Sequence, residues 1–462
     1  MKNTFKHPFH PKSMPKLIFI EPPHTWMDRI TRKMRNYGVE RLLARLIKHN
    51  IITEKDYACY DFSFDELKET ATEQEIAEYI NKHLTPIPKA EWVCFSVMET
   101  NYSNALYFAN YIKEKSPHSK IVFGGPAATE LQKEILEVHP FIDFIIYNTG
   151  EESFEQLISN QQPESIPNLI YRKNNEIIKN KELFPQNKWD EVFVKDIAWN
   201  STGKYVNNHF IVLGSLGCIA KCDFCVIIKK EPQLYERATK KIIEEIEECI
   251  EIAKERRKNN KDQEEKQNEQ IYIQIMHQNF CHRIKELMQK LEQKNLLEHI
   301  GAIGFNARAD TFLIEKSQND LLWCLNKYEK TKIEIFIGIE NYAQSALNDI
   351  GKNIRAETNK KATEKLIHFR ERYNFNFLLS FIGLSHKTTK EDLQQNTKAL
   401  IQYFTNREIL HPIHYLFSSP LRLDIKLTDQ LKITREKGFY PKNNFKKFRK
   451  QGNFAYPKCN RF

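Results

Sequence analysis

Short apolar runs of strand length alternate with segments of helical periodicity along most of this chain, and this alternation constrains its fold more than any other feature. In the first 160 residues the apolar runs lie at residues 16–20, 92–97, 120–123 and 141–147. Helical patterns lie at residues 39–49, 104–114 and 151–158. Alternation of this kind predicts βαβ units and a doubly wound, flavodoxin-like parallel sheet. Such sheets bind ligands at the carboxyl ends of their strands.

The alternation stops near residue 160 and resumes near residue 205. Residues 161–205 are polar and proline-containing, and they predict a linker with one short strand at 168–172. Further strands are expected at residues 210–213, 270–275, 300–306, 332–337 and 376–381, and helices at residues such as 239–256 and 317–328. We therefore expect two α/β domains, residues 1–160 and 206–405, followed by a C-terminal extension at 406–462. That extension is basic and rich in Phe and Tyr, which fits either a tail packed on the second domain or a lid or partner-binding segment.

The composition excludes several classes of protein. Lys and Arg number 70 against 60 Asp and Glu, and this excess is too dilute to indicate nucleic-acid binding. The N-terminal residues lack the apolar core of a signal peptide, and no stretch approaches the roughly 18 apolar residues of a membrane helix. Nine cysteines in 462 residues make no disulfide scaffold. We expect a cytoplasmic protein with neither a membrane nor nucleic acid among its partners.

The most specific motif is a cluster of three cysteines. Cys218, Cys222 and Cys225 have the spacing CxxxCxxC and follow the expected strand at 210–213. Thiolates are preferred ligands of zinc and of iron–sulfur clusters, but a structural zinc needs four ligands and no fourth cysteine lies nearby. Three thiolates on a four-iron cluster leave one iron open to an external ligand, which favours a reactive cluster.

At these residues the chain resembles the radical S-adenosylmethionine (SAM) superfamily, whose motif carries an aromatic residue before the last cysteine, here Phe224. The resemblance implies a partial (β/α) barrel, a 4Fe–4S cluster held by the three cysteines, and SAM bound at the open iron. It also implies that the reduced cluster cleaves SAM to a 5′-deoxyadenosyl radical, which removes a hydrogen atom from the substrate. An electron donor such as flavodoxin or ferredoxin would reduce the cluster.

Other segments match the superfamily by position. Asn306 and Arg308 follow the strand at 300–306, where relatives carry polar residues near the SAM ribose. Glu340 stands in a segment similar to the family's GIES motif, and Ile382 in one similar to the stretch near the adenine. One departure is His277, because many relatives have an acidic pair at this point. His277 is either a substrate-facing acid or base, since imidazole titrates near neutrality, or a histidine hydrogen-bonded at a strand end.

The first domain resembles the cobalamin-binding domain that precedes the radical SAM domain in one large subclass. The matching segments are Ser96-Val97-Met98, Gly124-Gly125-Pro126 and Gly150-Glu151-Glu152. The expected contacts to cobalamin are Ser96, Val97, Met98, Glu99, Asn101, Tyr102, Gly124, Gly125, Pro126, Gly150 and Glu151. Glycines let a backbone approach a flat macrocycle closely, and a serine can hydrogen-bond a buried heterocycle. The alternative is an ordinary flavodoxin-like sheet whose glycines only turn the chain.

Two features of this domain depart from other cobalamin proteins. The DxHxxG pattern that supplies a lower cobalt ligand is absent, and His24 does not stand in that setting. The resemblance implies that residues 98–102 cover the lower face of the corrin instead. Relatives usually read GEGE where this chain has Asn148-Thr149-Gly150-Glu151.

The resemblance implies an enzyme that uses cobalamin, a 4Fe–4S cluster and SAM, most often to methylate an unactivated carbon with methylcobalamin. An alternative is ring closure, contraction or oxidation with the same cofactors. A third hypothesis is a non-catalytic corrinoid and iron–sulfur sensor. The substrate class stays open between small molecules and peptides. A methylthiotransferase is disfavoured, because such enzymes carry a second group of three cysteines upstream of the motif. Here only Cys59 and Cys94 precede it, and both fall in or near apolar strands.

Overall fold

The computed structural model describes residues 15–24, 35–65, 72–84, 89–98, 100–183, 191–201, 208–225, 233–259, 270–382, 388–404 and 413–415. These residues form two compact units. The first lies within Met1–Leu183 and Ile197–Tyr205, and the second within Phe184–Asp196 and Val206–Leu423. Apart from residues 413–415, the C-terminal extension lies outside the described residues.

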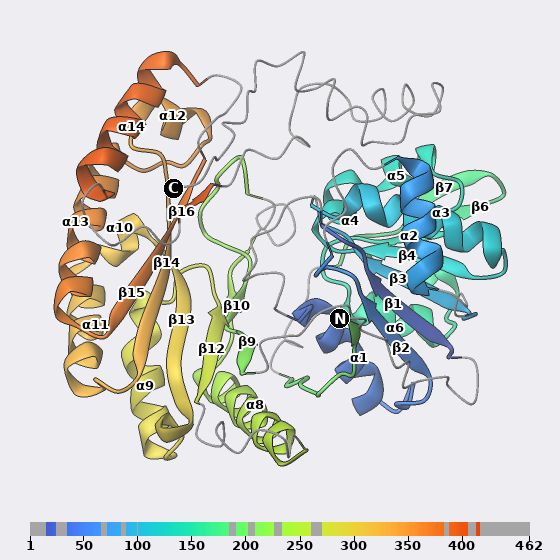
Figure 1. Cartoon of the computed structure of the whole chain (residues 1–462), viewed down its shortest axis with the longest axis horizontal. Helices are drawn as coiled ribbons and strands as arrows, with labels where there is room; N and C mark the ends of the chain where they lie inside the picture. Colours follow the sequence, from blue (N-terminus) through green and yellow to red (C-terminus); the bar gives the residue numbers. More distant parts are fainter. Residues whose placement is uncertain are drawn as a thin grey trace, which may run out of the picture. The chain divides into compact units, whose positions relative to one another are not determined.

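The first unit is built on a sheet of eight strands in the order β7-β6-β5-β4-β3-β1-β2-β8 (Figure 1). The strands are β1 Leu17–Glu21, β2 Tyr57–Asp61, β3 Trp92–Ser96, β4 Lys120–Gly124, β5 Phe144–Ile146, β6 Leu169–Lys173, β7 Glu176–Lys179 and β8 Asn200–Ser201. Strands β1 to β5 pair in parallel in the order 5-4-3-1-2, which is the flavodoxin-like arrangement. The predicted doubly wound sheet is therefore confirmed, and its order reverses between β1 and β3.

Helices cover both faces of this sheet. They are α1 Tyr37–Lys48, α2 Glu73–Leu84, α3 Tyr102–Lys115, α4 Pro126–Leu131, α5 Lys133–Val138 and α6 Glu151–Ile158. On one face, Leu43 of α1 and Phe154 of α6 share a buried core with Phe19 of β1. On the other, the Phe108 ring of α3 lies 5.5 Å from that of Phe62 and 6.4 Å from that of Tyr79 in α2. Both faces of the central strands are thus removed from water, as their continuous apolar sequences require.

The segment 161–205, expected to be a linker, contributes strands to the first sheet. Strands β6 and β7 form an antiparallel hairpin on β5, and β8 pairs with β2 at the opposite edge. Asn174 and Asn175 connect β6 to β7, both with positive φ (52° and 67°). This is the backbone that a two-residue hairpin turn needs and that asparagine tolerates. The expected strand at 168–172 corresponds to β6. Strand β7 was not expected, because its four residues mix polar with apolar side chains and are half-buried or exposed.

The second unit contains an all-parallel sheet of six strands in the order β16-β15-β14-β13-β12-β9. The strands are β9 His209–Leu213, β12 Ile271–Met276, β13 Ile300–Arg308, β14 Lys332–Glu340, β15 Phe375–Phe381 and β16 Ile413–Tyr415. A short hairpin, β10 Ser215–Leu216 with β11 Tyr235–Glu236, lies outside this sheet. The longer helices are α8 Thr239–Asn259, α9 Ile284–Gln293, α11 Glu315–Lys327, α13 Ala356–Arg372 and α14 Lys390–Phe404, and the short ones are α10 Ala309–Phe312 and α12 Gln344–Asp349. Six neighbouring parallel strands in chain order form an open, partial barrel, as predicted.

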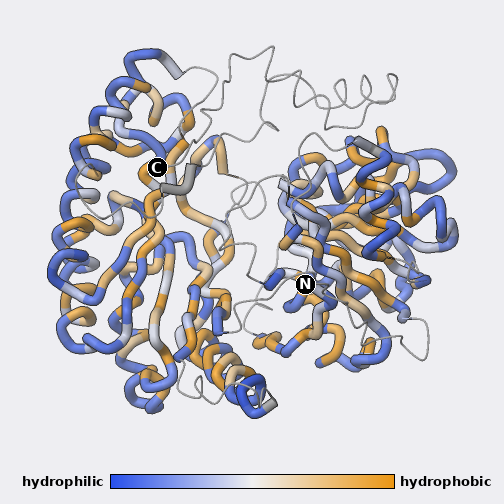
Figure 2. The backbone as a smooth tube through the Cα atoms, in the orientation of Figure 1, coloured by the Kyte–Doolittle hydropathy of each residue, from blue (hydrophilic) through white to orange (hydrophobic). Residues whose placement is uncertain are grey.

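The two faces of this sheet differ in character. On β12, β13 and β14, the side chains of Ile273, Ile303 and Ile335 lie on the face that packs against the helices, and all three are fully buried. Gln274, Gly304 and Glu334 are paired neighbours on the opposite face. Figure 2 shows the hydrophobic residues concentrated in the strands and the hydrophilic ones on the outer sides of the helices. None of the helices in the described segments combines the length and apolar character needed to cross a membrane.

Candidate functional site

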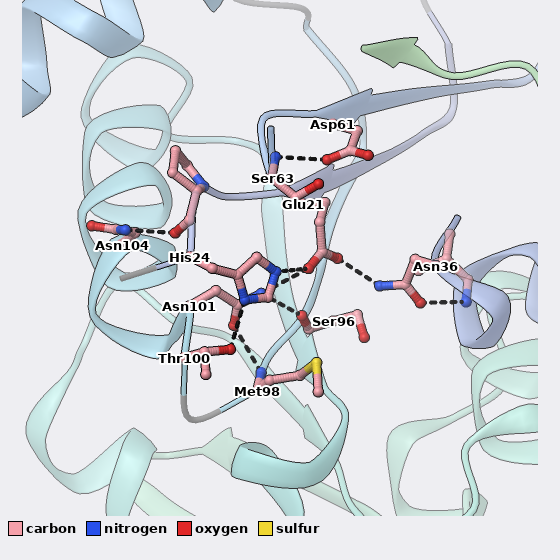
Figure 3. Close-up of polar contacts among 12 residues, drawn as sticks. Glu21, His24, Asn36, Asp61, Ser63, Ser96, Met98, Thr100, Asn101 and Asn104 are labelled. Carbon is pink, nitrogen blue, oxygen red and sulfur yellow. Dashed lines mark hydrogen bonds and ion pairs between the residues drawn. The ribbon is translucent and has the colours of Figure 1, made fainter. Parts of the chain in front are cut away.

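A buried polar network occupies the carboxyl ends of β1 and β3, where the strand order of the first unit reverses (Figure 3). Its centre is the Glu21 carboxylate, which accepts hydrogen bonds from Asn36 Nδ2 at 2.6 Å and Asn101 Nδ2 at 2.8 Å. His24 Nε2 lies 3.0 Å from Glu21 Oε1, and His24 Nδ1 lies 2.6 Å from the Thr100 hydroxyl. Both ring nitrogens of His24 are therefore engaged, and its side chain is buried. His24 is not placed as a cobalt ligand.

This network shapes the loop that follows β3. The Asn101 side chain accepts a hydrogen bond from the Met98 amide at 2.8 Å and donates one to the Ser96 carbonyl at 3.2 Å. The loop is thereby held closed, with the Met98 side chain exposed. Glu99 lies outside the described residues. Of the residues expected to cover the lower face of the corrin, Met98 and residues 100–102 lie at the carboxyl edge of the sheet, where sheets of this type bind their ligands.

The glycine pair after β4 packs against this loop. A Cβ on Gly125, whose φ is +95°, would lie 2.8 Å from the Val97 carbonyl oxygen. One on Gly124 would meet its nearest neighbour, the Ile146 carbonyl oxygen, at 3.8 Å. Gly125 therefore makes room for the protein's own backbone. Pro126 begins α4 directly after this turn.

The remaining residues predicted to contact cobalamin line the same edge. Gly150 and Glu151 begin α6 after β5, and Glu151 Oε1 lies 3.4 Å from Arg41 Nε. The Asn148 side chain donates a hydrogen bond to Glu182. Where relatives carry the first residue of the GEGE segment, this chain therefore has an asparagine, and its side-chain amide binds Glu182, which follows the hairpin of β6 and β7.

The donors at this edge fit a polar ligand. The Ser96 hydroxyl forms no hydrogen bond with other described residues and lies beside Gly125. The buried oxygens Tyr102 Oη and Ser103 Oγ also have no partner in the described part of the chain. Burial raises the pKa of Tyr102, so this phenol is neutral and can donate. The set is compatible with the polar tail of a cobalamin.

In the second unit, the three cysteines lie in the loop after β10. Cys222 is buried, whereas Cys218 and Cys225 are half-buried. Among the described residues, no three His, Cys, Asp or Glu side chains are placed to share one metal ion. A four-iron cluster makes no such demand, because each thiolate binds a different iron. Three thiols on one partly exposed loop fit that cluster by their chemistry.

The cysteine loop is anchored by a turn that follows α12. The Asp223 amide donates a hydrogen bond to the Ile350 carbonyl at 3.1 Å. A Cβ on Gly351, whose φ is +61°, would lie 2.5 Å from Asp223 Oδ2. The Lys352 ammonium lies 5.9 Å from the centre of the Phe224 ring. The aromatic residue of the motif thus contacts a buried cation.

The residues predicted to seat SAM meet at the carboxyl edge of the second sheet. Asn306 and Arg308 end β13, and Glu340 ends β14 with a φ of +57°. The Glu340 carboxylate accepts a hydrogen bond from Ser380 Oγ at 3.1 Å and pairs with Lys352 Nζ at 2.6 Å. Ile382 is buried, and its amide donates to the Glu340 carbonyl at 2.8 Å.

His277 is held by the protein on both sides of its ring. Its Nδ1 accepts a hydrogen bond from the Asn279 amide at 2.9 Å, so Nε2 carries the proton and donates to Glu236 Oε1 at 3.0 Å. Burial lowers the pKa of His277 to about 4, although Glu236 opposes this shift. Of the two roles considered for His277, this geometry fits a histidine hydrogen-bonded at a strand end. It lends no support to a role as a substrate-facing acid or base.

Sequence reasoning missed Glu21, Asn36, Thr100 and Lys352. Glu21 carried a signal, because a carboxylate that ends an apolar strand before two prolines enters a buried edge and needs partners. Lys352 carried none, since a lone lysine after a helix is usually solvated.

Comparisons with known proteins show what the two units resemble. A family model described as the B12 binding domain matches residues 61–158. The chain is 22% identical over 402 residues to an anaerobic magnesium-protoporphyrin IX monomethyl ester cyclase of Synechocystis sp., covering 84% of this chain and 72% of the relative. It is 24% identical over 130 residues to the cobalamin-dependent radical SAM methyltransferase TokK of Streptomyces tokunonensis, covering 27% of this chain and 18% of TokK.

The fold is also that of a solved structure. The cobalamin-dependent SAM radical enzyme OxsB, with aqua-cobalamin and SAM bound, superposes with a TM-score of 0.59 at 16% identity. The match covers 92% of this chain and 56% of OxsB, so the chain spans little more than half of that protein. The resemblance to radical SAM proteins that carry a cobalamin-binding domain is confirmed.

Proposed function

We propose that this chain, whose fold and first domain are those of cobalamin-dependent radical SAM proteins, is an enzyme that methylates an unactivated carbon. The observation that carries the proposal is the presence, in one chain, of a B12 binding domain and a loop with three cysteines spaced CxxxCxxC. That loop lies at the carboxyl edge of an open parallel sheet. The substrate would be a small molecule or a peptide, and a flavodoxin or ferredoxin would supply electrons.

The cofactors would divide the chemistry. A reduced cluster on Cys218, Cys222 and Cys225 would cleave SAM to the hydrogen-abstracting 5′-deoxyadenosyl radical, while cobalamin would supply the methyl group. The protein holds the reacting groups in position and excludes water.

Within the second unit, the chain's own residues prepare the SAM site. Asn306 presents an amide from the end of β13. Glu340 presents a carboxylate whose charge is already balanced by Lys352 at 2.6 Å. A buried carboxylate of this kind keeps a defined orientation for hydrogen-bond donors such as a ribose hydroxyl, because its other contacts fix it.

A second function has its own support. The relative matched over 84% of this chain is a cyclase rather than a methyltransferase. The same cofactor set used for ring closure or oxidation would need no methyl transfer, and the residues of both sites would serve equally.

The deciding experiment uses protein produced anaerobically with cobalamin and a reconstituted cluster. After addition of SAM and a low-potential reductant, 5′-deoxyadenosine and S-adenosylhomocysteine are measured by mass spectrometry, and bound corrinoid by absorbance. Both products, lost together in Cys222→Ala, support the methyltransferase. Deoxyadenosine alone supports the cyclase-like alternative. Neither product, from protein that holds cluster and corrinoid, would contradict both and favour a sensor.

A further inference from the structure

We propose that Arg308, oriented by Asp310, sets the reduction potential of the iron–sulfur cluster through a hydrogen bond to the Cys222 sulfur. This inference rests on the proposed function only in assuming that Cys218, Cys222 and Cys225 hold a cluster. It assigns Arg308 a role toward the cluster itself, which differs from the contact to the SAM ribose that the sequence suggested.

The geometry places one guanidinium between a thiol and a carboxylate. Arg308 Nη1 lies 3.7 Å from Cys222 Sγ, although 86 residues separate the two in sequence. Arg308 Nε and Nη2 each lie 3.0 Å from one oxygen of Asp310. The Asp310 carboxylate thus accepts hydrogen bonds from two of the three guanidinium nitrogens of Arg308, and the third nitrogen is directed at the Cys222 sulfur.

The guanidinium is permanently charged and mostly shielded from water. The Arg308 side chain is 12% exposed, against 40% for Asp310. Burial opposes its charge, but the hydrogen bonds to Asp310 and Cys222 outweigh burial and raise the pKa of Arg308. Its charge therefore acts on the sulfur through a medium of low dielectric constant.

A charge at this place must act on the redox equilibrium. Reduction adds an electron to the cluster, and hydrogen bonds to its sulfurs are among the factors that set its potential. The positive charge and the N–H donor of Arg308 both stabilise the reduced form and raise the potential. Asp310 carries the opposite charge and lowers the potential, while it holds the donor in place.

Substitutions of Arg308 and Asp310 should therefore shift the midpoint potential of the cluster in opposite directions. Arg308→Gln removes the cation and should move the midpoint potential to more negative values. Asp310→Asn removes the anion and keeps a side chain that can still accept from Arg308, so it should move the potential to more positive values. A tenfold change in the reduction equilibrium in either direction corresponds to ~59 mV for one electron.

The second unit offers a matched control pair. Arg256 Nη2 lies 2.5 Å from Asp196 Oδ1, and the two side chains are 13% and 42% exposed, nearly the same as Arg308 and Asp310. Arg256 lies on α8, and Asp196 precedes β9 in the chain. The variants R256Q and D196N remove the same charges from an ion pair outside the cysteine loop and should leave the potential unchanged.

The test is a potentiometric titration of the full chain with a reconstituted cluster, in the absence of SAM, followed by electron paramagnetic resonance. The inference is supported if R308Q shifts the midpoint downward, D310N shifts it upward, and R308K shifts it less than R308Q. It is overturned if R308Q and D310N leave the midpoint unchanged, or shift it in the same direction. If R308Q fails to load a cluster, D310N alone decides by its upward shift or its absence. A wild-type chain that holds no cluster would instead contradict the proposed function.

Discussion

The carbonyl oxygen of Val97 lies 2.8 Å from the position that a Cβ atom would take on Gly125. The same carbonyl accepts a hydrogen bond from the Ala127 amide at 3.0 Å, and the Val97 amide donates to the Gly124 carbonyl at 2.8 Å. The loop after β3 and the turn after β4 are therefore joined by backbone contacts that leave no room for a side chain.

Gly125→Ala should destabilise the first unit by ~1–3 kcal/mol, because the new residue would combine a positive φ with this close contact. We expect a lower midpoint of thermal unfolding and weaker cobalamin binding. Gly124→Ala is the matched control, since its Cβ would meet only an ordinary contact at 3.8 Å. Equal effects of the two substitutions would show that the contact with Val97 is not responsible.

Glu21→Gln should weaken cobalamin binding by about tenfold or more while the chain stays folded. An amide cannot accept all three hydrogen bonds that the carboxylate receives from Asn36, His24 and Asn101, and hydrogen bonds to charged groups contribute ~1.5–3 kcal/mol. The loop that contains Met98 would lose its fixed shape.

The measurement for Glu21→Gln is a titration of the chain with cobalamin, followed by absorbance. Glu91→Gln, which removes an exposed partner of Lys120, should bind like wild type. An unchanged affinity in Glu21→Gln would refute the role of the network.

Cys222→Ala should lose the iron and the visible absorbance of the reconstituted cluster, because it removes one of three thiolate ligands. Cys281→Ala should retain both. Burial raises the pKa of Cys281 to about 12, so this thiol is neutral and inert within the hydrophobic core of the second unit. Iron and sulfide analysis checks both variants. A cluster that survives in Cys222→Ala would disprove the assignment of the loop.

The stability of the second unit should fall as the pH decreases from about 6.5 towards 4. Burial lowers the pKa of His209 to about 4, although Glu334 opposes this shift. The unfolded chain therefore binds a proton in this interval that the folded chain does not bind, and acid favours unfolding. His209→Gln should reduce this dependence, measured as the unfolding midpoint against pH. Exposed His118→Gln should not change it.

The fold class was predictable because its signals are local. Apolar runs of strand length and helical periodicity depend on neighbours a few residues apart, and they identified the parallel sheets of both units. The strand expected at 168–172 corresponds to β6, whereas strands β2 and β7 were missed because their sequences, such as Tyr57–Asp61, mix polar and apolar residues. Their pairing partners supply the stability that their own composition does not.

The alternation of strands and helices and the spacing of Cys218, Cys222 and Cys225 could be predicted from the sequence, because both are properties of residues close together in the chain. Only the tertiary structure brought Thr100 to His24 and Arg308 to Cys222, 76 and 86 residues apart. The tertiary structure also engages both ring nitrogens of His277 in hydrogen bonds with the protein. Which strand ends become neighbours depends on the pairing order of the whole sheet, and that order is set by long-range packing which no single segment encodes.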